Sequence, residues 1–67
     1  MADRIVKFLA DSIDEDLKTA VCTEDVVEKV EVDEYGLHLW RWSLLNNEEM
    51  HYIVPLTEEN KMFKFID

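Results

Sequence analysis

Residues 26–45 read VVEKVEVDEYGLHLWRWSLL and carry the clearest strand pattern in the chain. Apolar and charged residues alternate over residues 29–33, which is the period of a β-strand with one buried face. Tyr35 and Gly36 follow as a tight turn, and residues 37–45 form the returning strand. The stretch therefore predicts an antiparallel hairpin.

Two further segments extend this hairpin into a meander. Residues 46–49 are a polar turn, and residues 50–54 form a third strand that Pro55 closes. Residues 57–60 form another turn, and residues 62–66 then read as a fourth strand or as a short helix capped by Thr57. We favour the strand because symmetric closure of the turns places Val32 opposite Leu39 and Val54 opposite Phe63, on one common face.

The alternation predicts that the two faces of the sheet have different roles. The core face collects Val30, Val32, Leu37, Leu39, Tyr52, Val54, Phe63 and Phe65. The opposite face collects Glu31, Asp33, His38, Trp40, Trp42, Leu44, His51, Ile53, Met62 and Ile66. Because a solvent-facing sheet surface is normally polar, the apolar members Trp40, Trp42, Leu44 and Ile53 predict an interface. Its occupant is either a second copy, which makes a homodimer, or a different partner.

Residues 3–21 show helical spacing. One stripe at steps of three and four residues collects Ile5, Phe8, Leu9, Ile13, Leu17, Ala20 and Val21. Ser12 with Glu15 matches a capping box that would divide the segment into two short helices. The sequence therefore predicts an α+β fold: an N-terminal helix, or two short helices, packed on an antiparallel meander of three or four strands. All 67 residues form one small domain.

Charge is strongly segregated along the chain. Between residues 11 and 34 there are ten acidic side chains and two basic ones, which accounts for −8 of the net charge of −9. Such a field repels nucleic acid and anionic membranes and favours a basic protein surface. The candidate binding acids are Asp11, Asp14, Glu15, Glu24, Asp25, Glu28, Glu31 and Asp33. The alternative is a solvated surface that only aids solubility.

The sequence gives little support for a catalytic or metal-binding site. His38 and His51 lie on neighbouring predicted strands, but two histidines without a third ligand are a weak zinc signal. The single Gly lies in a predicted turn, so no phosphate-binding loop is present, and the single Cys22 reads as a small core residue in a reducing compartment. We expect a non-enzymatic protein without cofactor or metal.

Small size, strong acidity, an ordered core and a predicted homodimer resemble the DNA-mimic inhibitors encoded by bacteriophages and mobile elements. The resemblance lies in the charge pattern of the middle third of the chain. It implies a cytoplasmic protein of the host cell that binds and inhibits a basic DNA-binding protein, such as an HU-type nucleoid protein, RNA polymerase or a nuclease, without contacting nucleic acid or membrane itself. Two alternatives are an immunity or antitoxin protein directed against a basic nuclease toxin, and a structural or assembly protein.

Overall fold

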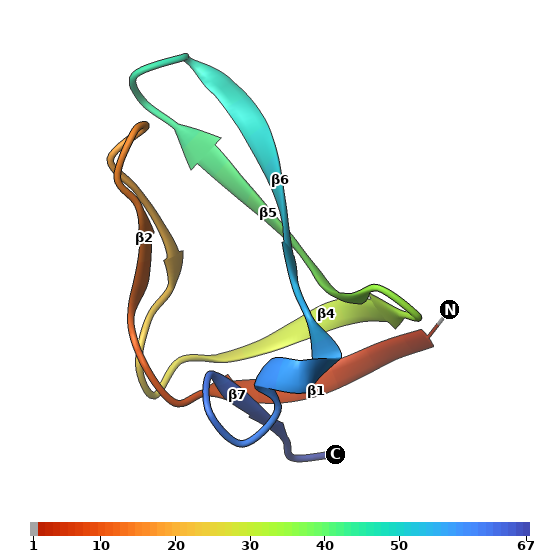
Figure 1. Cartoon of the computed structure of the whole chain (residues 1–67). Coiled ribbons are helices and arrows are strands. Elements are labelled where there is room, and N and C mark those ends of the chain that lie inside the picture. The colour runs from red at the N-terminus through yellow and green to blue at the C-terminus, as the bar shows by residue number, and fades with distance from the viewer. Residues whose placement is uncertain (1) are drawn as a thin grey trace.

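The computed structural model describes residues 2–67, whose regular structure consists of antiparallel β-strands and one short 3-10 turn (Figure 1). Five strands form one sheet in the order β6-β5-β4-β1-β7, and β2 and β3 form a separate hairpin. The elements are β1 (Ala2–Phe8), β2 (Ser12–Asp14), β3 (Thr19–Cys22), β4 (Val27–Asp33), β5 (Gly36–Ser43), β6 (Glu48–Val54), the 3-10 turn η1 (Leu56–Glu58) and β7 (Phe63–Phe65). Among these residues no helix is long and apolar enough to cross a membrane.

The predicted N-terminal helix is wrong, and with it the α+β class. β1 is a strand that pairs with β4 on one side and with β7 on the other. Val6 and Phe8, two positions apart, are buried, whereas Ile5, which precedes Val6, is 39% exposed. The helical stripe was misleading because Ile5 and Phe8 are three residues apart, a spacing that also places two side chains on one face of a helix. Pairing with two neighbouring strands satisfies the backbone of β1 on both sides and overrides the local pattern.

Residues 12–22 form the β2–β3 hairpin instead of a second helix. Asp14 caps its turn, since its Oδ1 accepts hydrogen bonds from the backbone N–H groups of Asp16 (3.1 Å) and Leu17 (3.3 Å). Lys18 adopts a positive φ of 54° in the same turn. An aspartate that bonds to the backbone two and three residues later favours a turn over a helix, so the predicted capping box at Ser12 does not form.

The predicted core face is confirmed. Five of its eight residues are buried, and the other three (Val32, Tyr52 and Phe65) are partly buried and pack against the core. The pairing between β4 and β5 differs from the symmetric expectation by two residues, because Val32 lies opposite Leu37. A shift of two preserves the face of every side chain, which is why the faces were predicted correctly although the register was not.

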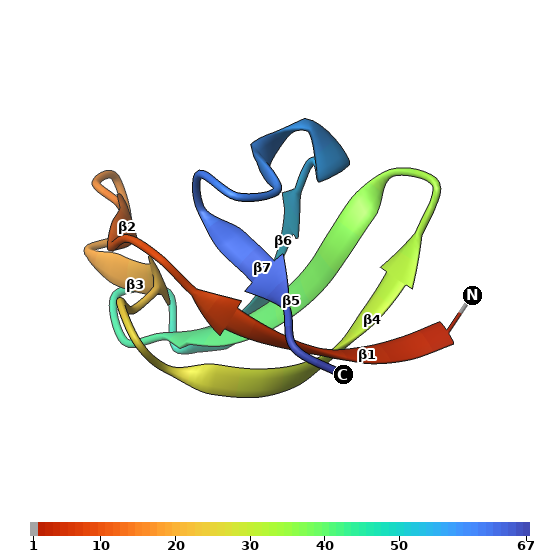
Figure 2. The same ribbon diagram turned by 90° about the horizontal axis from the view of Figure 1, so that it is seen from below.

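The last strand has a different neighbour from the one expected. Residues 63–65 are a strand, but β7 pairs with β1, placing Phe63 opposite Phe8, and not with β6. After Val54 the chain turns through η1 and crosses to the far edge of the sheet (Figure 2). Met62, which we expected on the outer face, is therefore half-buried against the core.

The sheet is strongly curved. In Figure 1 the β5–β6 hairpin rises away from β4 and β1, and the β2–β3 hairpin stands opposite it. Arg41 on β5 joins these parts: its Nε donates to the Val21 carbonyl on β3 (2.9 Å), and its guanidinium forms two bonds to Glu28 on β4 (2.7 and 3.0 Å). Both side chains of this ion pair are mostly covered, so the planar fork positions β3, β4 and β5 relative to one another.

Acid is expected to weaken the attachment of residue 67 to β1. Arg4 Nε donates to both carboxylate oxygens of Asp67 (2.9 and 3.0 Å), and these bonds hold the pKa of Asp67 below its ordinary value. The stabilisation is therefore present above about pH 4, the unfolded pKa of an aspartate, and disappears as the pH falls through the lower folded pKa.

Urea unfolding at pH 7 and pH 3 tests this expectation. The Asp67→Asn variant should lose less stability between the two pH values than the parent chain does. Lys64→Ala, which removes an exposed charge from β7, serves as the control. Equal losses for the parent and Asp67→Asn would contradict a contribution from the Arg4–Asp67 pair.

Candidate protein interface

The outer face of the β5–β6 hairpin presents a patch of exposed aromatic side chains. Alternation along β5 directs Leu37 and Leu39 into the core and leaves Trp40 and Trp42 outside, 54% and 56% exposed. Cross-strand pairing places His51 opposite Trp40, and their rings stack at 4.2 Å. We call the outer-face side chains His38, Trp40, Trp42, His51 and Ile53 the aromatic face.

The two histidines of the aromatic face form a row of close polar contacts with Asp33, the Asp33–His38–His51 chain. His38 Nδ1 lies 2.8 Å from His51 Nε2, and His38 Nε2 lies 2.7 Å from Asp33 Oδ2. One of the two rings donates and the other accepts in the His38–His51 contact, whereas the contact of His38 Nε2 with Asp33 is close but is not aligned as a hydrogen bond. The chain thus fixes the ring of His51, on which Trp40 stacks.

Asp33 is the anchor of this chain. Its Oδ1 accepts hydrogen bonds from the backbone N–H groups of Tyr35 (2.8 Å) and Gly36 (3.3 Å) and so closes the β4–β5 turn. Partial burial acts to raise the pKa of Asp33, but the Tyr35 N–H and His38 outweigh it and lower the pKa below the ordinary value. Asp33 is therefore held as a carboxylate by the turn that it closes.

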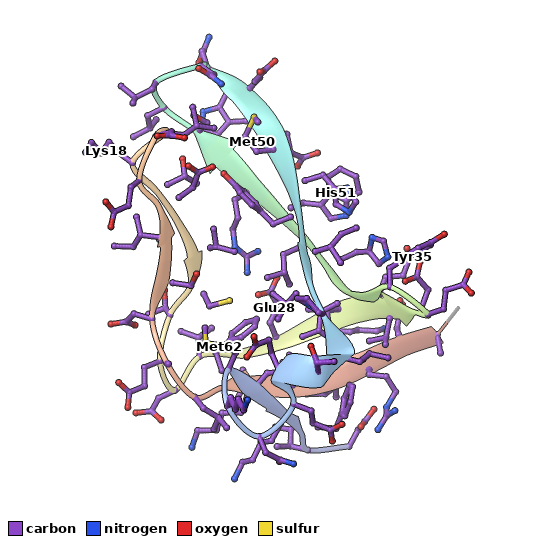
Figure 3. The ribbon with its side chains drawn as sticks, in the orientation of Figure 1. Lys18, Glu28, Tyr35, Met50, His51 and Met62 are labelled. Atoms are coloured by element: carbon purple, nitrogen blue, oxygen red, sulfur yellow. The ribbon has the colours of Figure 1, made fainter. Side chains whose placement is uncertain are left out.

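Acidic and aliphatic side chains lie around the aromatic face. Glu31 on β4 is opposite His38, and Glu49 on β6 is opposite Trp42. Leu44, in the turn after β5, is 86% exposed, and Leu45 beside it is also exposed. Figure 3 shows His51 on the outer side of the β5–β6 hairpin, whereas Glu28 and Met62 lie on the side toward the β2–β3 hairpin. The result is an apolar centre with carboxylates at its margin.

The eight candidate acids do not form a single line, and four of them have structural partners. Asp14 caps a turn and accepts a hydrogen bond from the Tyr52 hydroxyl (2.8 Å), Glu28 binds Arg41, and Asp33 closes the β4–β5 turn. Asp11 Oδ1 accepts from the backbone N–H of Glu24 (2.8 Å) and ties together the loops before β2 and after β3. These contacts account for half of the predicted set by folding alone.

The remaining four candidates are exposed. Glu24 and Asp25 lie in the loop between β3 and β4, close to Asp11, and Asp25 is 3.7 Å from the ammonium of Lys7. Glu15 lies in the turn of the β2–β3 hairpin, and Glu31 lies on the outer side of β4. The structure therefore brings Asp11, Glu24 and Asp25 together and leaves Glu15 and Glu31 elsewhere on the surface.

The other candidate chemistry is limited. Cys22 is buried in the core, as expected from the sequence, and this burial raises the pKa of its thiol. Within residues 2–67 no group of three His, Cys, Asp or Glu side chains is placed to hold a metal ion.

Sequence reasoning missed the Asp33–His38–His51 chain and the Arg41–Glu28 fork. The one sequence signal for the Asp33–His38–His51 chain was that both histidines fall on the same face of neighbouring predicted strands. No sequence signal indicated the Arg41–Glu28 pair.

Comparison with known proteins identifies no relative of this chain. No protein-family model, no curated protein and no solved structure matches this chain. The function must therefore be inferred from the surface itself.

Proposed function

We propose that this chain is a non-enzymatic acidic protein that binds a basic, DNA-binding protein and keeps it from its DNA. The observation on which this proposal rests is the exposed pair Trp40 and Trp42, bordered by Glu31 and Glu49, on a chain of net charge −9. Exposed tryptophans are the side chains that most often dominate binding energy in protein interfaces. Carboxylates around them favour a partner with lysines and arginines.

The apolar side chains and the carboxylates contribute to binding in different ways. Trp40, Trp42 and Ile53 supply apolar contact area that salt does not screen. Exposed acids such as Glu24, Asp25 and Glu31 accelerate association and make it salt-dependent, while Glu28 and Asp33 serve the fold. The acids proposed to face the partner are thus a subset of those expected from the sequence.

A DNA-displacement assay tests the proposal. A fluorescent DNA duplex is bound to a purified HU-type protein, to RNA polymerase or to a basic nuclease, and the acidic chain is titrated in. We expect the duplex to be displaced from one of these proteins, less efficiently as salt is raised. Trp40→Ala combined with Trp42→Ala should weaken displacement by about tenfold or more.

Matched charge variants separate a specific surface from general acidity. Glu24→Gln, Asp25→Asn and Glu31→Gln together remove three of the exposed charges proposed to face the partner, and Asp16→Asn, Glu34→Gln and Glu59→Gln remove three exposed charges elsewhere. The first set should weaken displacement several-fold more than the second. Equal weakening by both sets, or no displacement from any of the three proteins, would overturn the proposal.

A homodimer through the aromatic face is the competing use of the same side chains. Because one face cannot serve a twin and a target at once, self-association would reduce displacement. Sedimentation over a range of concentrations, with and without the two tryptophan substitutions, distinguishes the two uses.

A further inference from the structure

The edge of β6 is open. β6 pairs with β5 over its seven residues and with no other strand among residues 2–67. Natural edge strands are usually short or interrupted by lysine or proline, and β7, the other edge, has three residues. β6 is seven residues long and contains neither lysine nor proline, since Pro55 comes only after its last residue. Its outer row of backbone N–H and C=O groups is therefore free to pair with an extended chain.

A groove of about 460 Å³ lies beside this strand. Its walls come from the β2–β3 hairpin on one side and from β6 and η1 on the other. Val21, Val54 and Met62 give it an apolar lining, and Asp14 and Glu58 are the carboxylates within it. β2 pairs only with β3 among the described strands, so a second unpaired strand edge belongs to the opposite wall. Figure 1 shows the two hairpins that supply these walls standing opposite each other.

One hydrogen bond joins the two walls. The Tyr52 hydroxyl on β6 donates to Asp14 Oδ2 on β2 (2.8 Å), and burial together with this bond raises the pKa of Tyr52. The contact holds the β2–β3 hairpin at a fixed distance from β6. The groove is therefore a preformed feature of the fold, with one wall on each hairpin.

We propose that an extended segment of the basic partner adds to the edge of β6 as a further strand. Because side chains of a strand alternate between its two faces, every second side chain of that segment enters the groove, where Val21, Val54 and Met62 receive apolar groups. Lysine or arginine side chains of the segment lie close to Asp14 and Glu58. The choice of a basic segment rests on the proposed function, and the two carboxylates of the groove support it independently.

A second copy of this chain is a poorer occupant. Each copy has a net charge of −9, so bringing two copies together edge to edge is opposed by electrostatic repulsion. A segment with alternating basic and apolar residues matches both the backbone edge and the carboxylates of the groove. Charge complementarity thus selects the basic segment.

Synthetic peptides test the proposal on the intact protein. The probe is a capped peptide of alternating lysine and valine, as long as β6, and the controls are the same peptide N-methylated at alternate amides and a glutamate–valine peptide. In amide NMR spectra the lysine–valine peptide should shift β6 and groove resonances and slow the hydrogen exchange of β6 amides. N-methylation should weaken binding at least about tenfold, because it removes the backbone hydrogen bonds.

Variants of the protein test the role of the groove. Glu58→Gln should weaken peptide binding by about two- to fivefold, whereas Glu34→Gln, in the β4–β5 turn, should not change it. Equal binding of the N-methylated peptide, shifts confined to the aromatic face, or β6 amides already protected in a dimer that excludes the peptide would each overturn the proposal.

The same peptides separate this proposal from the proposed function. Trp40→Ala with Trp42→Ala should leave peptide binding unchanged while reducing DNA displacement. Peptide binding without displacement would support the strand-addition site and contradict the proposed function, and displacement without peptide binding would do the reverse.

Discussion

Replacing Gly36 by alanine is expected to remove most of the stability of the protein. Gly36 begins β5 with a φ of +137°, a backbone conformation that residues with a side chain rarely adopt. An added Cβ would lie 2.0 Å from the Val54 carbonyl oxygen, an atom of the paired backbone of β6 that cannot move aside cheaply. Backbone strain alone costs about 1–3 kcal/mol, and the clash adds to it. A domain of this size has a total stability of only about 3–10 kcal/mol.

Urea unfolding followed by circular dichroism measures this effect. Tyr35→Ala is the matched control, because Tyr35 precedes Gly36 in the same turn, is exposed, and has no positive φ. We expect Gly36→Ala to be largely unfolded without urea and Tyr35→Ala to resemble the parent chain. An unchanged unfolding midpoint for Gly36→Ala would show that β5 and β6 do not approach as closely as described.

Truncation of Phe63 to alanine is expected to cost about 3–5 kcal/mol. Its ring is 0% exposed and packs edge-to-face against Phe65 at 5.4 Å. Phe63 also lies opposite Phe8 across the β1–β7 pair, which consists of only three residue pairs. Removing the ring therefore leaves a cavity in the core and takes away the main apolar anchor of a very short strand.

Phe65→Ala is the matched control, because the ring is only partly buried and lies on the same strand. It should cost less than Phe63→Ala in urea unfolding. In the Phe63→Ala variant we also expect faster amide hydrogen exchange for the β1–β7 pair than for the β5–β6 pair. Comparable destabilisation by both substitutions, or unchanged exchange in β1 and β7, would contradict the central position of Phe63.

The curvature of the sheet separates the two candidate binding surfaces. The β5–β6 hairpin leaves the plane of β4, and this separation exposes Trp40 and Trp42 on one side and opens the groove on the other. Arg41 holds the arrangement from within by contacting Glu28 and the Val21 carbonyl. The aromatic face and the groove are thus the two sides of one hairpin.

Local sequence determined the β4–β5–β6 meander and the separation of its two faces. The alternation in residues 29–33, the turn at Tyr35 and Gly36, and the turn before β6 are all contained within short stretches. Strand parity survives the register error of two residues between β4 and β5. Exposure of Trp40 and Trp42 follows from the same parity. These features were predictable because neighbouring strands in a meander are close in sequence.

Tertiary structure alone decided the N-terminal segment, the position of β7 and the use of half of the acids. Ile5 and Phe8 fit a helix as well as a strand, and only pairing with β4 and β7, distant in sequence, made β1 a strand. The same long-range contacts gave Asp14 a partner in Tyr52 and Glu28 a partner in Arg41. The physical reason is that backbone hydrogen bonds and core burial between remote segments outweigh local preferences of less than about 1 kcal/mol per residue.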